Sequence, residues 1–129
     1  MQEKYNEATF NRPEGDRPID LPMLEINIPE FIQQLKSEDT WNKYDHNAIT
    51  VFKTDALRLV LIAMHQNAEL PKHDAEGVIS VQVIEGNIEF ITDERTAHLG
   101  QKQVVTLHAG IPHSLKANEE SVILLTVVP

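Results

Sequence analysis

Short runs of apolar and β-branched residues recur about every ten residues from residue 48 onward, separated by turn-forming residues. Many short strands at this spacing are typical of a sandwich or a barrel, and no segment after residue 45 has a helical period. The pattern therefore predicts an all-β domain over residues 47–129. The expected strands are Ile49–Phe52, Leu57–Met64, Val78–Ile84, Ile88–Thr92, Val104–Leu107, His113–Ala117 and Val122–Val128.

Alternation within one of these runs indicates a strand with a single buried face. Ile79, Val81 and Val83 alternate with the polar residues Ser80 and Gln82. Successive side chains of a strand point to opposite faces, so the three apolar residues are expected to face the core.

Two other runs are apolar on both faces. Residues 57–64 and 122–128 are interrupted mainly by Arg58 and Thr126, whereas a half-exposed antiparallel strand should alternate. These strands need a second cover from the N-terminal arm, a short helix or a second subunit. We expect a homodimer, because a single arm can hide only part of such a surface.

The first 46 residues have a different pattern of apolar and turn-forming residues, which predicts an arm followed by a short helical segment. Residues 1–28 contain three prolines and a glycine, which disfavour long regular elements. Apolar residues that alternate with polar ones are suited to burial, which favours an arm that lies on another surface. These residues are Leu21, Leu24, Ile26 and Ile28. A disordered tail is the alternative.

Residues 29–36 predict a short helix. Pro29 suits the first helical position, and Phe31, Ile32 and Leu35 form one apolar stripe at helical spacing. Ser37 is then expected to cap a second short turn that runs through Trp41. We expect Trp41 to anchor this helical segment to the barrel, with residues 42–47 as a connector.

The composition of the chain argues against two classes of binding partner. The 129 residues include 20 acidic and 11 basic side chains, for a formal charge of -9. Such a chain is repelled by phosphate backbones and anionic lipids, so neither nucleic acid nor a membrane is expected as a partner. The absence of cysteine excludes disulfides and thiolate metal sites, and it fits a cytoplasmic location.

Two segments carry a resemblance to a known family. Asn67–His73, continued by Val78–Phe90, resembles the first motif of the cupin superfamily, and Lys102–His113 resembles the second. The chain is similar to small single-domain bacterial cupins of the type-2, RmlC-like kind. The resemblance implies a double-stranded β-helix, a jelly-roll barrel with a pocket inside.

Several glycines of the resemblance are kept and others are replaced. Gly86 provides the positive backbone torsion that a tight hairpin needs, and Gly110 shapes a bend before the next strand. Asn67 replaces the first glycine of motif one, which is acceptable because asparagine tolerates left-handed torsions. Lys102 stands at the place of the first glycine of motif two.

The metal-ligand set that the resemblance implies is incomplete. Metal-binding cupins carry two histidines one residue apart and then a glutamate in motif one, and a histidine in motif two. His73 and His113 match, but Ala75 and Ile79 stand where the second histidine and the glutamate would be. A divalent zinc, nickel, iron or manganese ion bound by His73 and His113 therefore stays open. Missing ligands would have to come from Asp74, Glu76, Gln82, His65 or His98.

Alternation also places one of these histidines inside. His113, Leu115 and Ala117 share one face of their strand, while Ser114 and Lys116 share the other. The polar face should be outside, so His113 is expected to point inward. A buried imidazole needs a partner, which is a metal, a ligand, water or another side chain.

We therefore expect a small-molecule binding protein, with His73 and His113 fixing the polar end of the ligand. The apolar wall would come from Ile79, Val81, Phe90 and Leu115. Two alternatives remain open. One is a metal-dependent enzyme of the isomerase or oxygenase type, and the other is a structural or interaction protein without a working pocket. Whether the chain is an enzyme is not decided by these residues.

Overall fold

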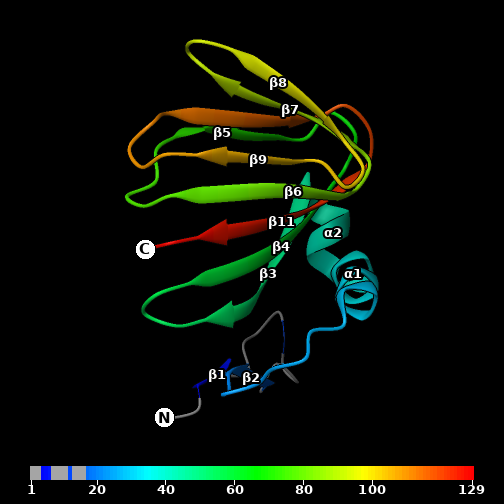
Figure 1. The fold of residues 1–129 in the computed structure, drawn as a ribbon. Helices are drawn as coiled ribbons and strands as arrows, with labels where there is room; N and C mark the ends of the chain where they lie inside the picture. Colours follow the sequence, from blue (N-terminus) through cyan, green and yellow to red (C-terminus); the bar gives the residue numbers. More distant parts are fainter. Residues whose placement is uncertain (1–3, 7–11, 13–16) are drawn as a thin grey trace.

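Two antiparallel sheets face one another in the computed structural model, which describes residues 4–6, 12 and 17–129 (Figure 1). One sheet has five strands in the order β3-β4-β11-β6-β9, and the other has four in the order β5-β10-β7-β8. A short pair, β1 (Lys4–Asn6) and β2 (Arg17–Asp20), precedes them. The other strands are β3 (His46–Lys53), β4 (Arg58–Met64), β5 (Glu69–His73), β6 (Ile79–Glu85), β7 (Asn87–Thr92), β8 (Thr96–Gly100), β9 (Val104–Leu107), β10 (His113–Ala117) and β11 (Ser121–Val127).

The expected all-β, jelly-roll class is confirmed, and strands β9 and β10 have the predicted bounds. Strands β5 and β8 were not predicted. Pro71 lies inside β5, most of whose residues are exposed, and β8 interrupts its apolar residues with the exposed Thr96 and His98. Residues 42–47 are not all a connector, because β3 begins at His46. The division of the chain between residues 46 and 47 stays a prediction.

The main core fills the space between the two sheets. Ile79, Val81 and Val83 are buried on one face of β6, as their alternation predicts. Leu115 and Ala117 are buried on the facing side from β10. These residues belong to one apolar cluster drawn from both sheets, so the core and the space for a pocket coincide.

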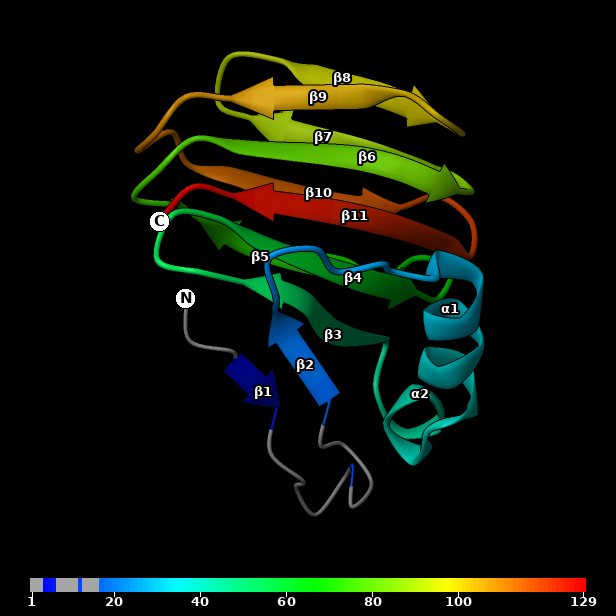
Figure 2. The same cartoon turned by 60° about the horizontal axis from the view of Figure 1, so that its bottom comes forward.

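A second core lies on the outer face of the five-stranded sheet. Helices α1 (Ile28–Ser37) and α2 (Asp39–Lys43) lie at one end of the sheet, and the segment after β2 runs along it toward α1 (Figure 2). Leu35 and Trp41 pack there with Leu61, Ala63 and Val122, all of them buried. The cover of β4 and β11 thus comes from this chain. The reason given above for a homodimer does not hold for these residues, and the dimer itself stays a prediction.

Local signals explain where the helices begin. The side chain of Asn27 accepts a hydrogen bond from the Glu30 amide at 3.1 Å, and Pro29 lies in the first turn of α1. The expected cap at Ser37 was wrong. Glu38 precedes α2, and the Ser37 hydroxyl instead donates to the Gln34 carbonyl within α1 at 2.9 Å. Neither described helix has the length and apolar character needed to cross a membrane.

Trp41 anchors the helical segment to the barrel, as predicted. Its ring stacks on that of His65, with 3.5 Å between centroids and 20° between planes. The Nε2 atom of His65 also lies 2.7 Å from the carbonyl oxygen of Trp41, and a carbonyl can only accept, so the imidazole donates. The His65 ring therefore contacts Trp41 of α2 and lies outside the barrel interior.

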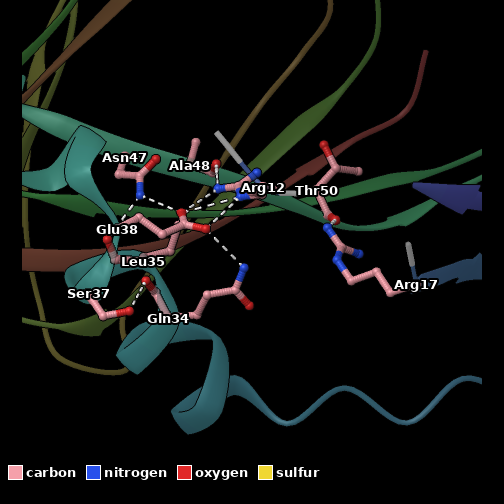
Figure 3. Close-up of polar contacts among 9 residues, drawn as sticks. All are labelled: Arg12, Arg17, Gln34, Leu35, Ser37, Glu38, Asn47, Ala48 and Thr50. Carbon is pink, nitrogen blue, oxygen red and sulfur yellow. Dashed lines mark hydrogen bonds and ion pairs between the residues drawn. The ribbon is translucent and has the colours of Figure 1, made fainter. Parts of the chain in front are cut away.

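A network centred on Glu38 connects Arg12 with α1 and β3 (Figure 3). Arg12 donates to both carboxylate oxygens, from Nε at 2.9 Å and from Nη2 at 3.0 Å. Asn47 donates from Nδ2 to Oε1 at 2.9 Å, and Gln34 donates from Nε2 to Oε2 at 3.1 Å. One carboxylate therefore joins the arm, α1 and β3.

Two arginines of the same segment reach the free edge of β3. Strand β3 is the outermost strand of its sheet, so alternate carbonyl groups have no partner strand. Arg12 donates from Nη2 to the carbonyl of Ala48 at 2.8 Å, and Arg17 donates to the carbonyl of Thr50. The two guanidinium groups therefore satisfy carbonyls that a further strand would otherwise bind.

We expect the Glu38 network to give the protein a specific sensitivity to acid. Burial raises the pKa of the Glu38 carboxyl, but the hydrogen bonds from Arg12, Asn47 and Gln34 outweigh it, so the pKa lies below the ordinary 4.5. A lowered folded-state pKa stabilises the protein above pH 4.5, and this contribution is lost as the pH falls through the folded-state value.

The variant Glu38→Gln should therefore be about 1 kcal/mol less stable than the parent protein at pH 7. The two should converge in stability as the pH falls below 4.5 and through the lowered folded-state pKa, which urea denaturation at several pH values measures. Glu119→Gln, on an exposed turn, is the control and should follow the parent curve. A constant difference between Glu38→Gln and parent from pH 7 to pH 3 would contradict the proposed network.

The replaced glycines of the two motifs keep their glycine-like conformations. Asn67 has a φ of 70° and Lys102 a φ of 74°. Lys102 is the third residue of a turn closed by the hydrogen bond from the Gln103 amide to the Gly100 carbonyl at 3.1 Å. That position favours glycine when φ is positive, and a lysine there carries strain.

Substituting Lys102→Gly should raise the free energy of unfolding by about 0.5–1 kcal/mol, because relief of the strain exceeds the added entropy of the unfolded chain. Thermal unfolding followed by circular dichroism measures the change. Lys102→Ala removes the same charge without relieving the backbone and should not be stabilising. Equal stabilisation by both variants would mean that charge, rather than conformation, is responsible.

Candidate functional site

His73 and His113 are brought together by the pairing of β5 with β10. Their Cα atoms are register partners across this antiparallel pair. The two ring centroids lie 4.5 Å apart, and the ring planes are inclined by 56°. Residues 40 positions apart in the chain therefore present two imidazoles at one place.

These rings lie at a cavity of about 80 Å³ inside the barrel. All six residues predicted to bind a ligand line it: His73, His113, Ile79, Val81, Phe90 and Leu115. Their role in binding stays a prediction, but the predicted set is gathered in one space. The rest of the lining was not predicted to contact a ligand: Ile62, Leu70, Ala75, Ile123, Leu125 and Val127.

Alternation could have found part of this missed set. Ile123, Leu125 and Val127 lie two residues apart along β11 and share one face. Because this strand is apolar on both faces, the sequence did not show which face was turned inward. The structure places these three residues at the cavity and buries Val122 against the helices.

The hydrogen bonds of the two imidazoles define which ring nitrogens are available. The Nδ1 atom of His73 lies 2.9 Å from the carbonyl oxygen of Pro71, and that of His113 lies 2.9 Å from the carbonyl oxygen of Ile111. A carbonyl only accepts, so each Nδ1 carries the proton and donates. In the neutral rings both Nε2 atoms are then acceptors, which is the tautomer that a metal ion or a hydrogen-bond donor would use.

The two histidines differ in depth. His113 is 5% exposed, whereas His73 is exposed. Phe90, itself buried, stacks on the ring of His113 with 5.3 Å between centroids and 15° between planes. The inward direction predicted for His113 is thus confirmed. Its ring lies between an aromatic wall and the more accessible ring of His73.

The donor set does not fit a tightly held divalent ion. Ala75 and Ile79, at the two unmatched positions of the metal motif, line the same cavity as His73 and His113. All four positions therefore converge, but only two carry a ligating atom. Among the described residues no group of three or more histidine, aspartate or glutamate side chains could hold a metal, whereas catalytic sites usually have three protein ligands.

The other suggested ligands are engaged elsewhere or do not reach the cavity. His65 packs on Trp41, and Nδ1 of His98 lies 3.7 Å from a carboxylate oxygen of Glu89. Gln82 donates to the carbonyl of Lys102 at 3.5 Å on the outer side of β6. Asp74 and Glu76 are exposed and are not part of the lining.

A larger groove of about 530 Å³ adjoins this cavity. It runs between the β7–β8 hairpin on one side and β9 with the following bend on the other. The lining includes Ala97, Val105, Leu107 and Ile111, with charged residues of the hairpin turn at its rim. Phe90 is shared by the groove and the cavity.

Solved structures resemble this arrangement, although no family model and no curated protein matches the chain. A cupin superfamily protein from Desulfitobacterium hafniense is 12% identical with a TM-score of 0.65, and the match covers 97% of each chain. The domain has the cupin fold. A conserved protein of unknown function from Streptococcus pyogenes is 28% identical over 64% of this chain and 73% of that chain, with a TM-score of 0.61.

One similar structure is an enzyme of greater length. Salicylate 1,2-dioxygenase from Pseudaminobacter salicylatoxidans matches with a TM-score of 0.74 and 16% identity. The match covers 85% of this cupin domain but 36% of the dioxygenase chain. At this identity the similarity establishes the fold alone.

Restoring the two missing ligands should create a metal site in this cupin domain. We expect the double variant Ala75→His, Ile79→Glu to bind one nickel or zinc ion per chain, because all four positions line one cavity. The parent protein, purified without a polyhistidine tag, should carry no stoichiometric metal. Elemental analysis and the rise of the melting temperature with added metal measure both.

The same double variant with His113→Ala serves as the control and should lose most of the gained affinity. A folded double variant that binds no metal would show that the four positions do not converge as described. Stoichiometric metal in the parent protein, lost on His113→Ala, would show that the two imidazoles suffice.

Proposed function

We propose that the barrel cavity binds a small molecule with an apolar body, whose hydroxyl group donates hydrogen bonds to His73 and His113. The observation that carries this proposal is the shared tautomer of the two rings. Both Nδ1 atoms donate to backbone carbonyls, so in the neutral rings both Nε2 atoms are acceptors, and both histidines line a largely apolar cavity. A ligand that donates a hydrogen bond complements these atoms better than one that only accepts.

The size of the cavity limits the size of the ligand. A protein cavity of about 150 Å³ holds benzene, and the space here is about 80 Å³. The part of the ligand inside the cavity is therefore smaller than benzene, of the size of a short aliphatic alcohol or diol. For five non-hydrogen atoms, a ceiling of about 1.5 kcal/mol per atom limits the dissociation constant to about micromolar at best.

The metal-dependent alternative has less support in this chain. An isomerase or oxygenase that works through a divalent ion needs ligands that Ala75 and Ile79 do not provide. The interaction-protein alternative predicts that no small molecule is bound at all. The two imidazoles that line this cavity, of which His113 is buried, support binding over both alternatives.

A matched pair of small probes tests the proposal. 2-Propanol and acetone have the same number of non-hydrogen atoms, but only 2-propanol donates a hydrogen bond. We expect millimolar 2-propanol to shift the Nε2 resonances of both histidines in ¹⁵N NMR spectra and acetone to have little effect. His113→Leu keeps the cavity apolar and should reduce the affinity for 2-propanol at least tenfold.

Two outcomes would contradict the proposal. Equal shifts with both probes would mean that the hydroxyl proton is not recognised. No shift with 2-propanol or with short diols would favour the interaction-protein alternative.

A further inference from the structure

One side chain, that of Phe90, lines both the histidine cavity and the larger groove. The cavity of about 80 Å³ and the groove of about 530 Å³ have one lining residue in common, Phe90. The groove falls within the range of about 300–1,000 Å³ that is typical of ligand pockets, whereas the cavity is far smaller. The boundary between the two spaces therefore includes this ring.

Phe90 is held in place from several sides. It is 3% exposed, and its strand β7 lies between β10 and β8. Its register partners are Leu115 on β10 and Ala97 on β8, and its ring stacks on His113. A ring packed in this way acts as a wall, because displacing it would disturb the core of both sheets.

The far side of the ring suits an alkyl chain. Val105 and Leu107 on β9, Ala97 on β8 and Ile111 in the bend line the groove, and Ile111 is partly open to solvent. Val105, Leu107 and Ala97 come from β9 and β8, the outer strands of the two facing sheets, so the groove follows the gap between them. A linear apolar chain would bury its surface along this gap.

We propose that Phe90 sets the length of the ligand by separating a polar compartment at the histidines from an apolar compartment in the groove. Short hydroxyl compounds enter the cavity, and alkyl chains bind in the groove without reaching His113. The part that concerns the cavity rests on the function proposed above. Removal of the ring joins the two spaces, so that one amphipathic molecule places its hydroxyl group at the histidines and its chain in the groove.

The variants Phe90→Ala and Phe90→Leu test this separation with 1-propanol and 1-octanol as probes. Methyl NMR spectra report on each compartment through Ile79 in the cavity and Ile111 in the groove. In the parent protein, 1-propanol should shift the Ile79 methyl groups and 1-octanol only those of Ile111. In a folded Phe90 variant, 1-octanol should shift both residues with one binding curve, at least tenfold tighter than in the parent.

Leu115→Ala is the matched control, because Leu115 lines the cavity but not the groove. It enlarges the cavity without joining the two spaces, so 1-octanol should still leave Ile79 unshifted. Simultaneous shifts of Ile79 and Ile111 by 1-octanol in the parent protein would overturn the proposal. Separate responses of Ile79 and Ile111 to 1-octanol in both folded Phe90 variants would also overturn it.

This result can be distinguished from failure of the proposed function. The histidine resonances with 2-propanol decide whether a hydroxyl group is recognised at the cavity. The two isoleucine methyl groups decide whether Phe90 separates the compartments, and this readout does not depend on a hydrogen bond to either imidazole.

Discussion

The pairing of β5 with β10 is the interaction on which the candidate site depends. It places His73 opposite His113, and both residues line one largely apolar cavity. Each ring is then oriented by a carbonyl two residues earlier in its own chain segment. The site therefore needs no long polar network, since the backbone that forms the strands and bends also fixes the tautomers.

A second constraint is that the five-stranded sheet must be covered on both faces. Its inner face closes the barrel, and its outer face packs under α1, α2 and the segment that precedes them. Leu35 and Trp41 fill this outer layer, while the stacked pair of Trp41 and His65 holds the helical segment in place. The barrel wall is thus rigid on the side opposite the cavity, which limits how far the lining can adapt to a larger ligand.

Alternation and turn residues predicted most of the barrel, because a strand with one buried face repeats every second residue. The two motifs also identified His73 and His113 before any contact was known. The prediction was incomplete for strands in which these signals are absent. Strand β5 is largely exposed and contains Pro71, so its pairing with β10 was not evident, and β11 is apolar on both faces. The Glu38 network joins residues 26 positions apart through polar side chains. Such a contact produces no repeating pattern in the sequence.

The arginines at the edge of β3 have a consequence for how copies of the chain meet. An uncovered outer strand is a template onto which another polypeptide can add, and charged side chains over the edge oppose this. Arg12 and Arg17 donate to the carbonyls of Ala48 and Thr50, so these two side chains oppose the addition of another strand at this edge. A chain shortened past Arg17 would lose these two contacts, and pairing of β3 with a strand of another chain would then be less opposed.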